Sequence, residues 1–114
     1  MASPSGKVPD DPLGFIRACV RNRRVLWTYH VNMRLKGRCV PRQAIMDAVA
    51  SCELVEAYPQ DKYLPSFLVL GRSGGDAFHV LFAVDVEADN VRVVTAYRPG
   101  AGEWEDDLRT RRAQ

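Results

Sequence analysis

The sequence of 114 residues predicts a single α+β domain, in which two or three helices pack on a four-stranded, mostly antiparallel sheet. Two observations lead to this prediction. Apolar residues recur at helical spacing in the first half of the chain, and from Glu53 onward they alternate with a period of two. Helical patterns followed by strand patterns are typical of α+β domains. We expect a disordered leader over residues 1–9 and one folded domain over residues 10–112.

Helices are predicted in three segments. The first begins where Asp10 or Asp11 can cap it and where Pro12 suits its first turn. The aromatic and β-branched residues 25–30 predict a short strand or an extended entry. A second, short helix follows and ends at Gly37, which can adopt the left-handed conformation of a helix end. The third begins at Pro41, and its apolar residues recur at i, i+4 and i+8 on one face.

Four strands are predicted near residues 53–58, 66–72, 77–87 and 91–97, separated by short turns such as residues 73–76. Consecutive strands of such a meander pair antiparallel. We expect the helices to cover one face, with Val49, Phe67 and Phe82 in the shared core. His79 and the residues alternating with it should lie on the opposite, half-open face. After the last strand, one or two helical turns are expected from Glu103, with Trp104 and Leu108 on one side.

The composition argues against membrane, secreted and metal-binding proteins. No apolar run approaches the roughly 18–20 residues that span a bilayer, and the first residues lack the apolar region of a signal peptide. The three cysteines are odd in number and form no C-x-x-C pair, so we expect buried thiols rather than disulfides or a zinc site. Phosphate-loop, dinucleotide-binding and metalloprotease motifs are absent. These observations predict a cytoplasmic protein without metal or cofactor.

Positive charge is concentrated in the first half of the chain. No acidic residue occurs between Pro12 and Met46, whereas eight basic residues do. Such a block favours a phosphate-bearing or acidic partner, RNA above all. The alternative is a solvated helix face that is balanced by acidic residues of the second half.

Four residues are candidates for catalysis of phosphodiester cleavage. His30 and Arg34 are four positions apart, so on a helix they share one side, where an imidazole can move a proton and a guanidinium can hold charge on phosphorus. His79 is the second proton carrier, or a hydrogen-bonded core residue. Tyr97 ends the last strand, where a tyrosine can donate a proton, stack on a base or simply cover the core.

Five further residues are predicted to bind substrate. Arg98 can clamp a phosphate. Arg38 would continue the side of the helix that carries the histidine and arginine described above if the helix ran past Gly37, and Lys36 adds charge beside it. Tyr63 and Ser66 enter the second strand, where they line a rim or serve as ordinary turn residues.

Several segments in order resemble a family of small prokaryotic proteins classed as a domain of unknown function. The residues that carry the resemblance are the His-x-x-x-Arg pattern at His30 and Arg34, Thr-Ala-Tyr-x-Pro at residues 95–99, and Trp104. That family is similar to RelE- and MqsR-like toxins. The resemblance implies a RelE/MqsR-like fold and an mRNA interferase from a type II toxin–antitoxin pair. It also implies a cognate antitoxin, of the zinc-finger YgiT/MqsA type. The positions that it implies for the site are His30, Arg34, Tyr63, Ser66, His79, Tyr97 and Arg98.

Two functions therefore remain as hypotheses. The first is a metal-independent endoribonuclease, in which His30 acts as base or acid, Tyr97 or His79 is its complement, and Arg34 and Arg98 clamp phosphate. The second is a catalytically silent protein- or RNA-binding module on the same fold. A small-molecule enzyme is a remote third, because no substrate is indicated. Convergence of the four catalytic candidates in one cleft favours the ribonuclease.

Overall fold

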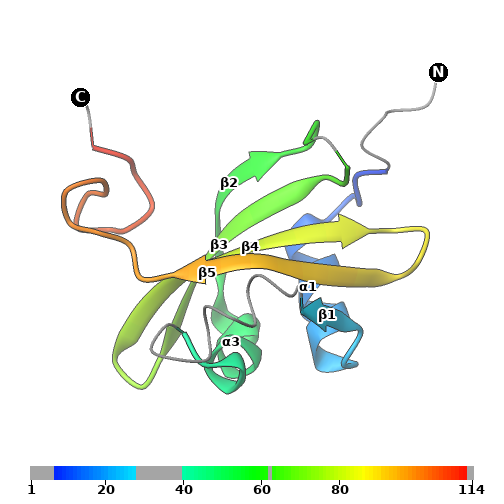
Figure 1. The fold of residues 1–114 in the computed structure, drawn as a ribbon, viewed down its shortest axis with the longest axis horizontal. Coiled ribbons are helices and arrows are strands. Elements are labelled where there is room, and N and C mark those ends of the chain that lie inside the picture. Colours follow the sequence, from blue (N-terminus) through cyan, green and yellow to red (C-terminus); the bar gives the residue numbers. More distant parts are fainter. Residues whose placement is uncertain (1–6, 28–39, 62, 113–114) are drawn as a thin grey trace.

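A mixed sheet of five strands forms the body of the computed structural model, which describes residues 7–27, 40–61 and 63–112 (Figure 1). The strands stand in the order β1-β5-β4-β3-β2. Their bounds are β1 (Val25–Trp27), β2 (Glu53–Tyr58), β3 (Ser66–Ser73), β4 (Asp76–Asp85) and β5 (Asn90–Tyr97). The helices of the described residues are α1 (Pro12–Arg21), α3 (Arg42–Ala48) and the 3₁₀ turn η1 (Val49–Ser51). The predicted α+β class is confirmed.

Strands β2 to β5 form the predicted meander, with antiparallel pairing between each pair of neighbours. The tightest connection is the β3–β4 hairpin. Its two turn residues, Gly74 and Gly75, have φ angles of 57° and 89°, which glycine adopts at little cost. The sequence therefore located this turn correctly.

The predicted number of strands was wrong, because β1 adds a fifth strand. It pairs parallel with β5, placing Val25 beside Val91 and Trp27 beside Val93. Next to this pairing, the Arg24 side chain donates a hydrogen bond of 2.9 Å to the carbonyl oxygen of Asp89. A run of three residues is too short to show alternation. The sequence therefore predicts either a short strand or an extended entry for this segment. The sheet is still mostly antiparallel.

Local hydrogen bonds cap helix α1 at both ends. The Asp11 carboxylate accepts a 3.0 Å hydrogen bond from the backbone N–H of Gly14 and so caps the first turn, in which Pro12 stands. At the other end, the N–H groups of Arg23 and Arg24 donate back to the carbonyls of Val20 and Cys19. This is the Schellman pattern, and it holds Arg23 at a positive φ of 59°.

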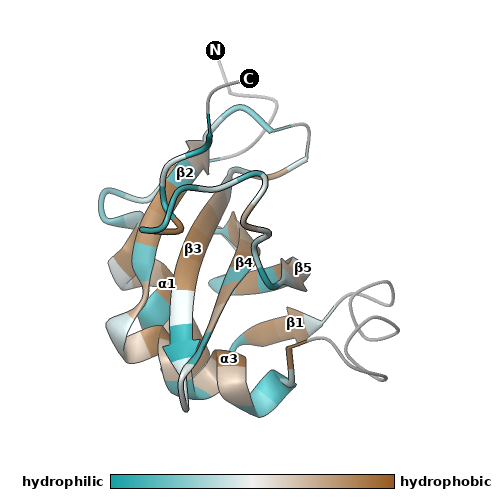
Figure 2. Ribbon diagram, turned by 90° about the vertical axis from the view of Figure 1, so that its left-hand side faces the viewer, coloured by the Kyte–Doolittle hydropathy of each residue, from teal (hydrophilic) through white to brown (hydrophobic). Residues whose placement is uncertain are grey.

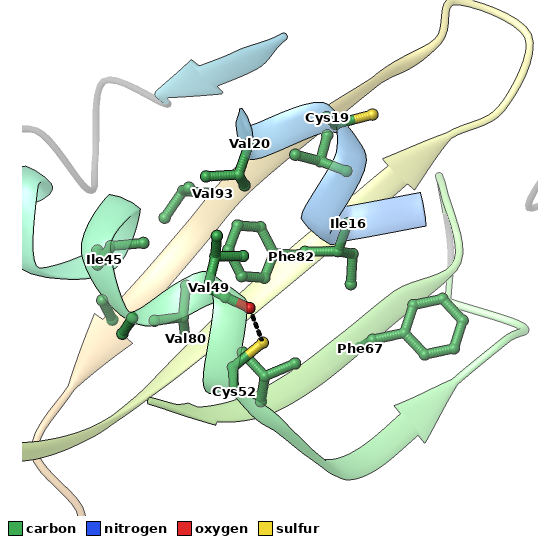
Figure 3. Packing of buried hydrophobic residues seen from close by; sticks show 14 of the residues in the cluster. Ile16, Cys19, Val20, Ile45, Val49, Cys52, Phe67, Val80, Phe82 and Val93 are labelled. Carbon is green, nitrogen blue, oxygen red and sulfur yellow. Dashed lines mark hydrogen bonds between the residues drawn. The ribbon is translucent and has the colours of Figure 1, made fainter. Parts of the chain in front are cut away.

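The core lies between the two helices and one face of the sheet. Ile16 and Val20 of α1, with Ile45 of α3, point toward Phe82 of β4 and its neighbours (Figure 3). The three residues predicted for the shared core, Val49, Phe67 and Phe82, all lie in this cluster. Cys19 and Cys52 are buried free thiols, as expected; Cys39 lies outside the described residues.

Two β-bulges change which side chains reach the opposite face. The register shifts between Leu54 and Glu56 in β2, and between the partners of Leu81 and Phe82, which leaves Val94 as an extra residue in β5. A one-residue shift turns every later side chain to the other face of the sheet. Glu56 therefore stands opposite Leu68, and Tyr97 opposite His79, all on the face away from the helices.

The chain after β5 is a turn-rich coil, orange to red in Figure 1, which we call the C-terminal strap (residues 99–112). The prediction of helical turns from Glu103 was wrong. Trp104 instead forms an isolated antiparallel bridge with Arg111. The Asp107 carboxylate accepts from the backbone N–H groups of Arg109 and Thr110, which fixes a turn at the tip. In Figure 2 this strap is mostly hydrophilic, whereas strand β3 is hydrophobic over most of its length.

Candidate functional site

His79 lies on β4, at the centre of a polar cluster on the sheet face away from the helices. The alternation of β4 puts Phe78 and Val80 in the core and turns His79 to the other side, as predicted. That side is not open at this position, because His79 is 0% exposed. A buried imidazole must find hydrogen-bond partners within the protein.

Both ring nitrogens of His79 have such partners. Nε2 lies 2.7 Å from the carbonyl oxygen of Leu108, and Nδ1 lies 3.3 Å from the Tyr97 hydroxyl. Because a carbonyl only accepts, Nε2 carries the proton of the neutral ring. Nδ1 is then the acceptor, and the Tyr97 hydroxyl donates to it. One hydrogen-bond pattern thus orients both side chains.

The C-terminal strap covers this pair. The Trp104 ring packs edge-on against the imidazole, with ring centroids 4.5 Å apart and an interplanar angle of 87°. Leu108 has a positive φ of 61°, an unfavourable conformation for a branched residue, and its carbonyl accepts the His79 hydrogen bond. Tyr97 is only partly buried, so it is the member of the pair that a molecule in solution can reach.

An ion pair ties the strap to β2. The Arg111 guanidinium donates to both carboxylate oxygens of Glu56, at 2.7 and 3.0 Å, and lies 4.5 Å from the centre of the Trp104 ring. Tyr58, two residues further along the same face, donates its hydroxyl to the same carboxylate. Bidentate pairing of this kind fixes orientation as well as charge.

Burial and charge set the protonation of the cluster. Burial lowers the pKa of His79 and raises the pKa of Tyr97, so each favours its neutral form. The hydrogen bonds from Arg111 lower the pKa of Glu56, and those to Glu56 raise the pKa of Arg111. At neutral pH the cluster therefore combines a neutral imidazole, a neutral phenol and a cation held by a carboxylate.

A hollow of about 240 Å³ opens elsewhere on the same face. Ser66, Ala83, Arg92 and Val94 line it from strands β3, β4 and β5, and Asp61 and Tyr63 line it from the loop before β3. Ala83 is four residues beyond His79 on β4, which corresponds to about 13 Å along the strand.

The structure brings together some of the predicted site residues and separates others. His79 and Tyr97 are in contact, whereas Tyr63 and Ser66 meet at the hollow. Ser66 is 2% exposed, and its hydroxyl donates to the carbonyl of Leu64. The Arg98 guanidinium pairs with Asp76 at 3.1 Å, at the start of β4. The remaining candidates, His30, Arg34, Lys36 and Arg38, lie outside the described residues.

Three members of the cluster were not predicted from the sequence: Glu56, Tyr58 and Arg111. Trp104 was predicted only to lie on a helical turn and to be a position of the family pattern. Glu56 and Tyr58 stand two positions apart in an alternating strand, which indicates a shared face. No pattern in the sequence indicated the partner on the strap.

The chain matches the family model described as Domain of unknown function (DUF4258) over residues 27–98. The chain belongs to this family. The DUF4258 match includes His79 and Tyr97 but ends before the C-terminal strap that covers them. Comparisons with curated proteins and with solved structures gave no match.

None of the helices in the part of the chain that the structure describes has the length and hydropathy needed to cross a membrane. No group of three or more His, Cys, Asp or Glu side chains stands in an arrangement for binding a metal ion, within the same residues.

Proposed function

We propose that this DUF4258 protein is a metal-independent endoribonuclease of the toxin type, similar to RelE- and MqsR-like mRNA interferases. The observation that carries the proposal is the hydrogen bond between the partly exposed Tyr97 hydroxyl and the buried, neutral His79. A β-bulge in β5 turns Tyr97 onto this face, and bulges are frequent next to active sites.

In the proposed reaction the ribose 2′-hydroxyl attacks the adjacent phosphorus. Its proton passes to the Tyr97 oxygen while the phenol proton passes to Nδ1 of His79. The new bond joins phosphorus to the 2′-oxygen, and the bond from phosphorus to the 5′-oxygen breaks. The departing 5′-oxygen takes a proton from a second acid, the role predicted for His30. The products are a 2′,3′-cyclic phosphate and a 5′-hydroxyl.

Arg111 supports this step by charge. It lies close enough to lower the pKa of Tyr97 electrostatically, although burial outweighs that effect. A fixed guanidinium beside the attacked phosphate stabilises the negative charge that develops there. Glu56 accepts two hydrogen bonds from that guanidinium and so holds it in place.

A second candidate function is a catalytically silent binding module for RNA or protein. It is favoured by one observation: both nitrogens of His79 already bond within the protein, and the ring is fully covered. Such a ring can serve only to orient Tyr97 and the strap.

Cleavage of mRNA by the purified chain in the presence of EDTA separates the two functions. The ribonuclease proposal expects cleavage with cyclic phosphate ends, and a loss of about 10²–10⁴-fold in Tyr97→Phe. The comparison variant is Tyr58→Phe, which removes a hydroxyl that bonds to Glu56 instead of to His79. The substitutions His30→Ala and Arg34→Ala are expected to abolish cleavage as well. Binding of RNA without cleavage supports the binding module.

We also propose a cognate antitoxin as partner, of the YgiT/MqsA zinc-finger type, with an acidic segment that faces the basic first half of the chain. Within this half, Arg21 and Arg23 are exposed at the end of α1. Co-expression with the neighbouring gene should restore growth that the chain alone inhibits, and pull-down should recover the complex at low salt.

A further inference from the structure

The hollow on the sheet face away from the helices combines three kinds of side chain that can bind single-stranded RNA: aromatic, acidic and basic. Tyr63, with 77% of its surface exposed, lines the hollow, and so do the acidic residue Asp61 and the basic residue Arg92. Ala83 and Val94 add apolar lining from two strands. We infer that this hollow binds a guanine base of the RNA substrate, an inference that rests on the proposed function in taking RNA as ligand.

The aromatic ring provides the sequence-independent part of the affinity. An exposed tyrosine beside an apolar hollow is a stacking platform, because every base has a flat face. Tyr63 sits on the loop that enters β3, so a base that slides into the hollow lies against its ring. Stacking alone accepts all four bases.

The carboxylate of Asp61 provides the selectivity. An ionised carboxylate only accepts hydrogen bonds, and it can accept two at once. Guanine presents two adjacent donors, N1–H and N2–H, on its Watson–Crick edge. Adenine and cytosine place an acceptor beside their amino group there, and uracil flanks its single N–H with two carbonyls. A carboxylate in the hollow therefore favours guanine over the other three bases.

Arg92 is placed to bind the phosphate of the same nucleotide. It stands opposite Ala83, its side chain is 46% exposed, and its guanidinium is 3.6 Å from the Asp85 carboxylate. That ion pair is long and half exposed, so it holds the side chain without saturating its five donors. The β-bulge at Val94 interrupts the strand two residues beyond Arg92 and adds a residue to the lining.

The positions of the hollow and of the His79–Tyr97 pair fit one extended RNA strand. Both lie on the same face, about 13 Å apart along β4. A base held at Ala83 thus leaves the following nucleotides to run along the sheet toward Tyr97. The hollow selects the base, and the pair acts on a neighbouring phosphodiester bond.

Binding of four fluorescent 2′-O-methyl pentanucleotides, which differ only in the central base and carry uridine at the other positions, tests the inference on the full chain. The 2′-O-methyl group removes the attacking hydroxyl, so binding is measured without cleavage. We expect the guanine probe to bind about tenfold more tightly than the adenine probe. Asp61→Asn should abolish this preference, whereas the exposed control Glu87→Gln should retain it. Tyr63→Ala should weaken all probes by similar factors of about 5–100-fold.

Salt dependence tests the cation separately. Arg92→Gln should reduce the slope of log affinity against log salt by about 0.7, the value for one phosphate contact on a single strand. Equal affinity of the wild-type chain for all four probes overturns the inference, and so does a guanine preference that survives in Asp61→Asn. If the wild-type chain cleaves RNA but shows no base preference, the inference fails and the proposed function stands. If it prefers guanine through Asp61 but does not cleave, the proposed cleavage fails and the guanine site stands.

Discussion

His79 shows how burial decides the chemistry of a single side chain. In water an imidazole exchanges its proton near neutral pH, but here burial lowers its pKa and leaves it neutral between a carbonyl and a phenol. The identity and face of His79 followed from the alternation of β4. Its complete burial did not, since it depends on Trp104 and Leu108, which arrive from a segment without regular periodicity.

The pH dependence of stability should carry the signature of His79. At a pH below about 6.5, the pKa of a histidine in an unfolded chain, the unfolded state binds a proton at this residue. The buried ring of the folded state stays neutral. The free energy of unfolding therefore falls as the pH is lowered from 8 toward 5, by at most about 1.4 kcal/mol per pH unit. We expect His79→Gln to flatten this slope in urea titrations, whatever its own stability. Identical slopes for the two proteins would show that folding does not lower the pKa of His79.

Gly71 marks a close approach between helix and sheet. A Cβ atom at this position would lie 2.8 Å from the Phe78 ring and 3.1 Å from the Cβ atom of Ala48. Gly71→Ala should therefore lower the free energy of unfolding by about 1–3 kcal/mol. The control is Gly102→Ala, where nothing lies within 4 Å of the new atom and φ is not positive. Thermal melts of both variants check this, and a neutral Gly71→Ala would mean that α3 can move away from β3.

At the scale of elements, the predictions succeeded where a pattern repeats and failed where one residue breaks it. Helix α1, helix α3 and strands β2, β4 and β5 were located from their periodicity, and strand β3 was located as a short apolar run. The bulges at residues 55 and 94 have no such signal, and around residue 94 a run of β-branched residues fits either face. The bulges place Glu56 and Tyr97 on the site face, whereas uninterrupted alternation would put both on the face that the helices cover.

The end of α1 offers a stabilising substitution. Arg23 occupies the left-handed position of a Schellman motif, where a side chain costs roughly 1 kcal/mol relative to glycine. Arg23→Gly should raise the free energy of unfolding by about 0.5–1 kcal/mol. Arg21→Gly, two residues earlier and inside the helix, should lower it by a similar amount. Urea denaturation of both variants gives the comparison, and a loss of stability in Arg23→Gly would contradict the argument.

The C-terminal strap should loosen when its ion pair is removed. Arg111 binds Glu56 and covers Trp104, so Arg111→Ala should expose the indole. In a Trp27→Phe background, where Trp104 is the remaining tryptophan, we expect a red shift of the emission maximum and faster proteolysis of the strap. Arg109→Ala removes the same charge from an exposed position of the strap and serves as control. Unchanged emission in Arg111→Ala would show that His79 and Leu108 hold the strap by themselves.

Over the whole molecule, the basic block is only partly available to a partner. Arg17 donates to the carbonyls of Val49 and Cys52, and Arg24 pairs with Asp89, so these two cations hold elements together. The sequence revealed the block and named balance by acidic residues as its alternative. Which cations take internal partners depends on tertiary contacts that local composition does not encode.

Charge reversal at the exposed end of α1 should therefore weaken RNA binding without unfolding the chain. Arg21→Glu combined with Arg23→Glu spares Arg24, whose reversal would repel Asp89. We expect affinity for polyuridylate at 50 mM salt to fall at least tenfold, with a shallower salt dependence. The pair Arg109→Glu with Arg72→Glu makes the same charge change elsewhere and is the comparison. Equal losses for the two pairs would show net charge, rather than a steering surface, to be responsible.

The parallel pairing of β1 with β5 has a consequence for the order of folding. Strands β2 to β5 are joined by short connections, so their hairpins can form early at a small cost in loop closure. Strand β1 finds its partner only after the rest of the meander exists, because Val25 pairs with Val91 across the whole sequence of β2, β3 and β4. During synthesis, α1 and β1 emerge from the ribosome first, yet they are completed last. Until then the hydrophobic side of β4 and β5 lacks its cover of α1, and a nascent chain in that state is exposed to aggregation.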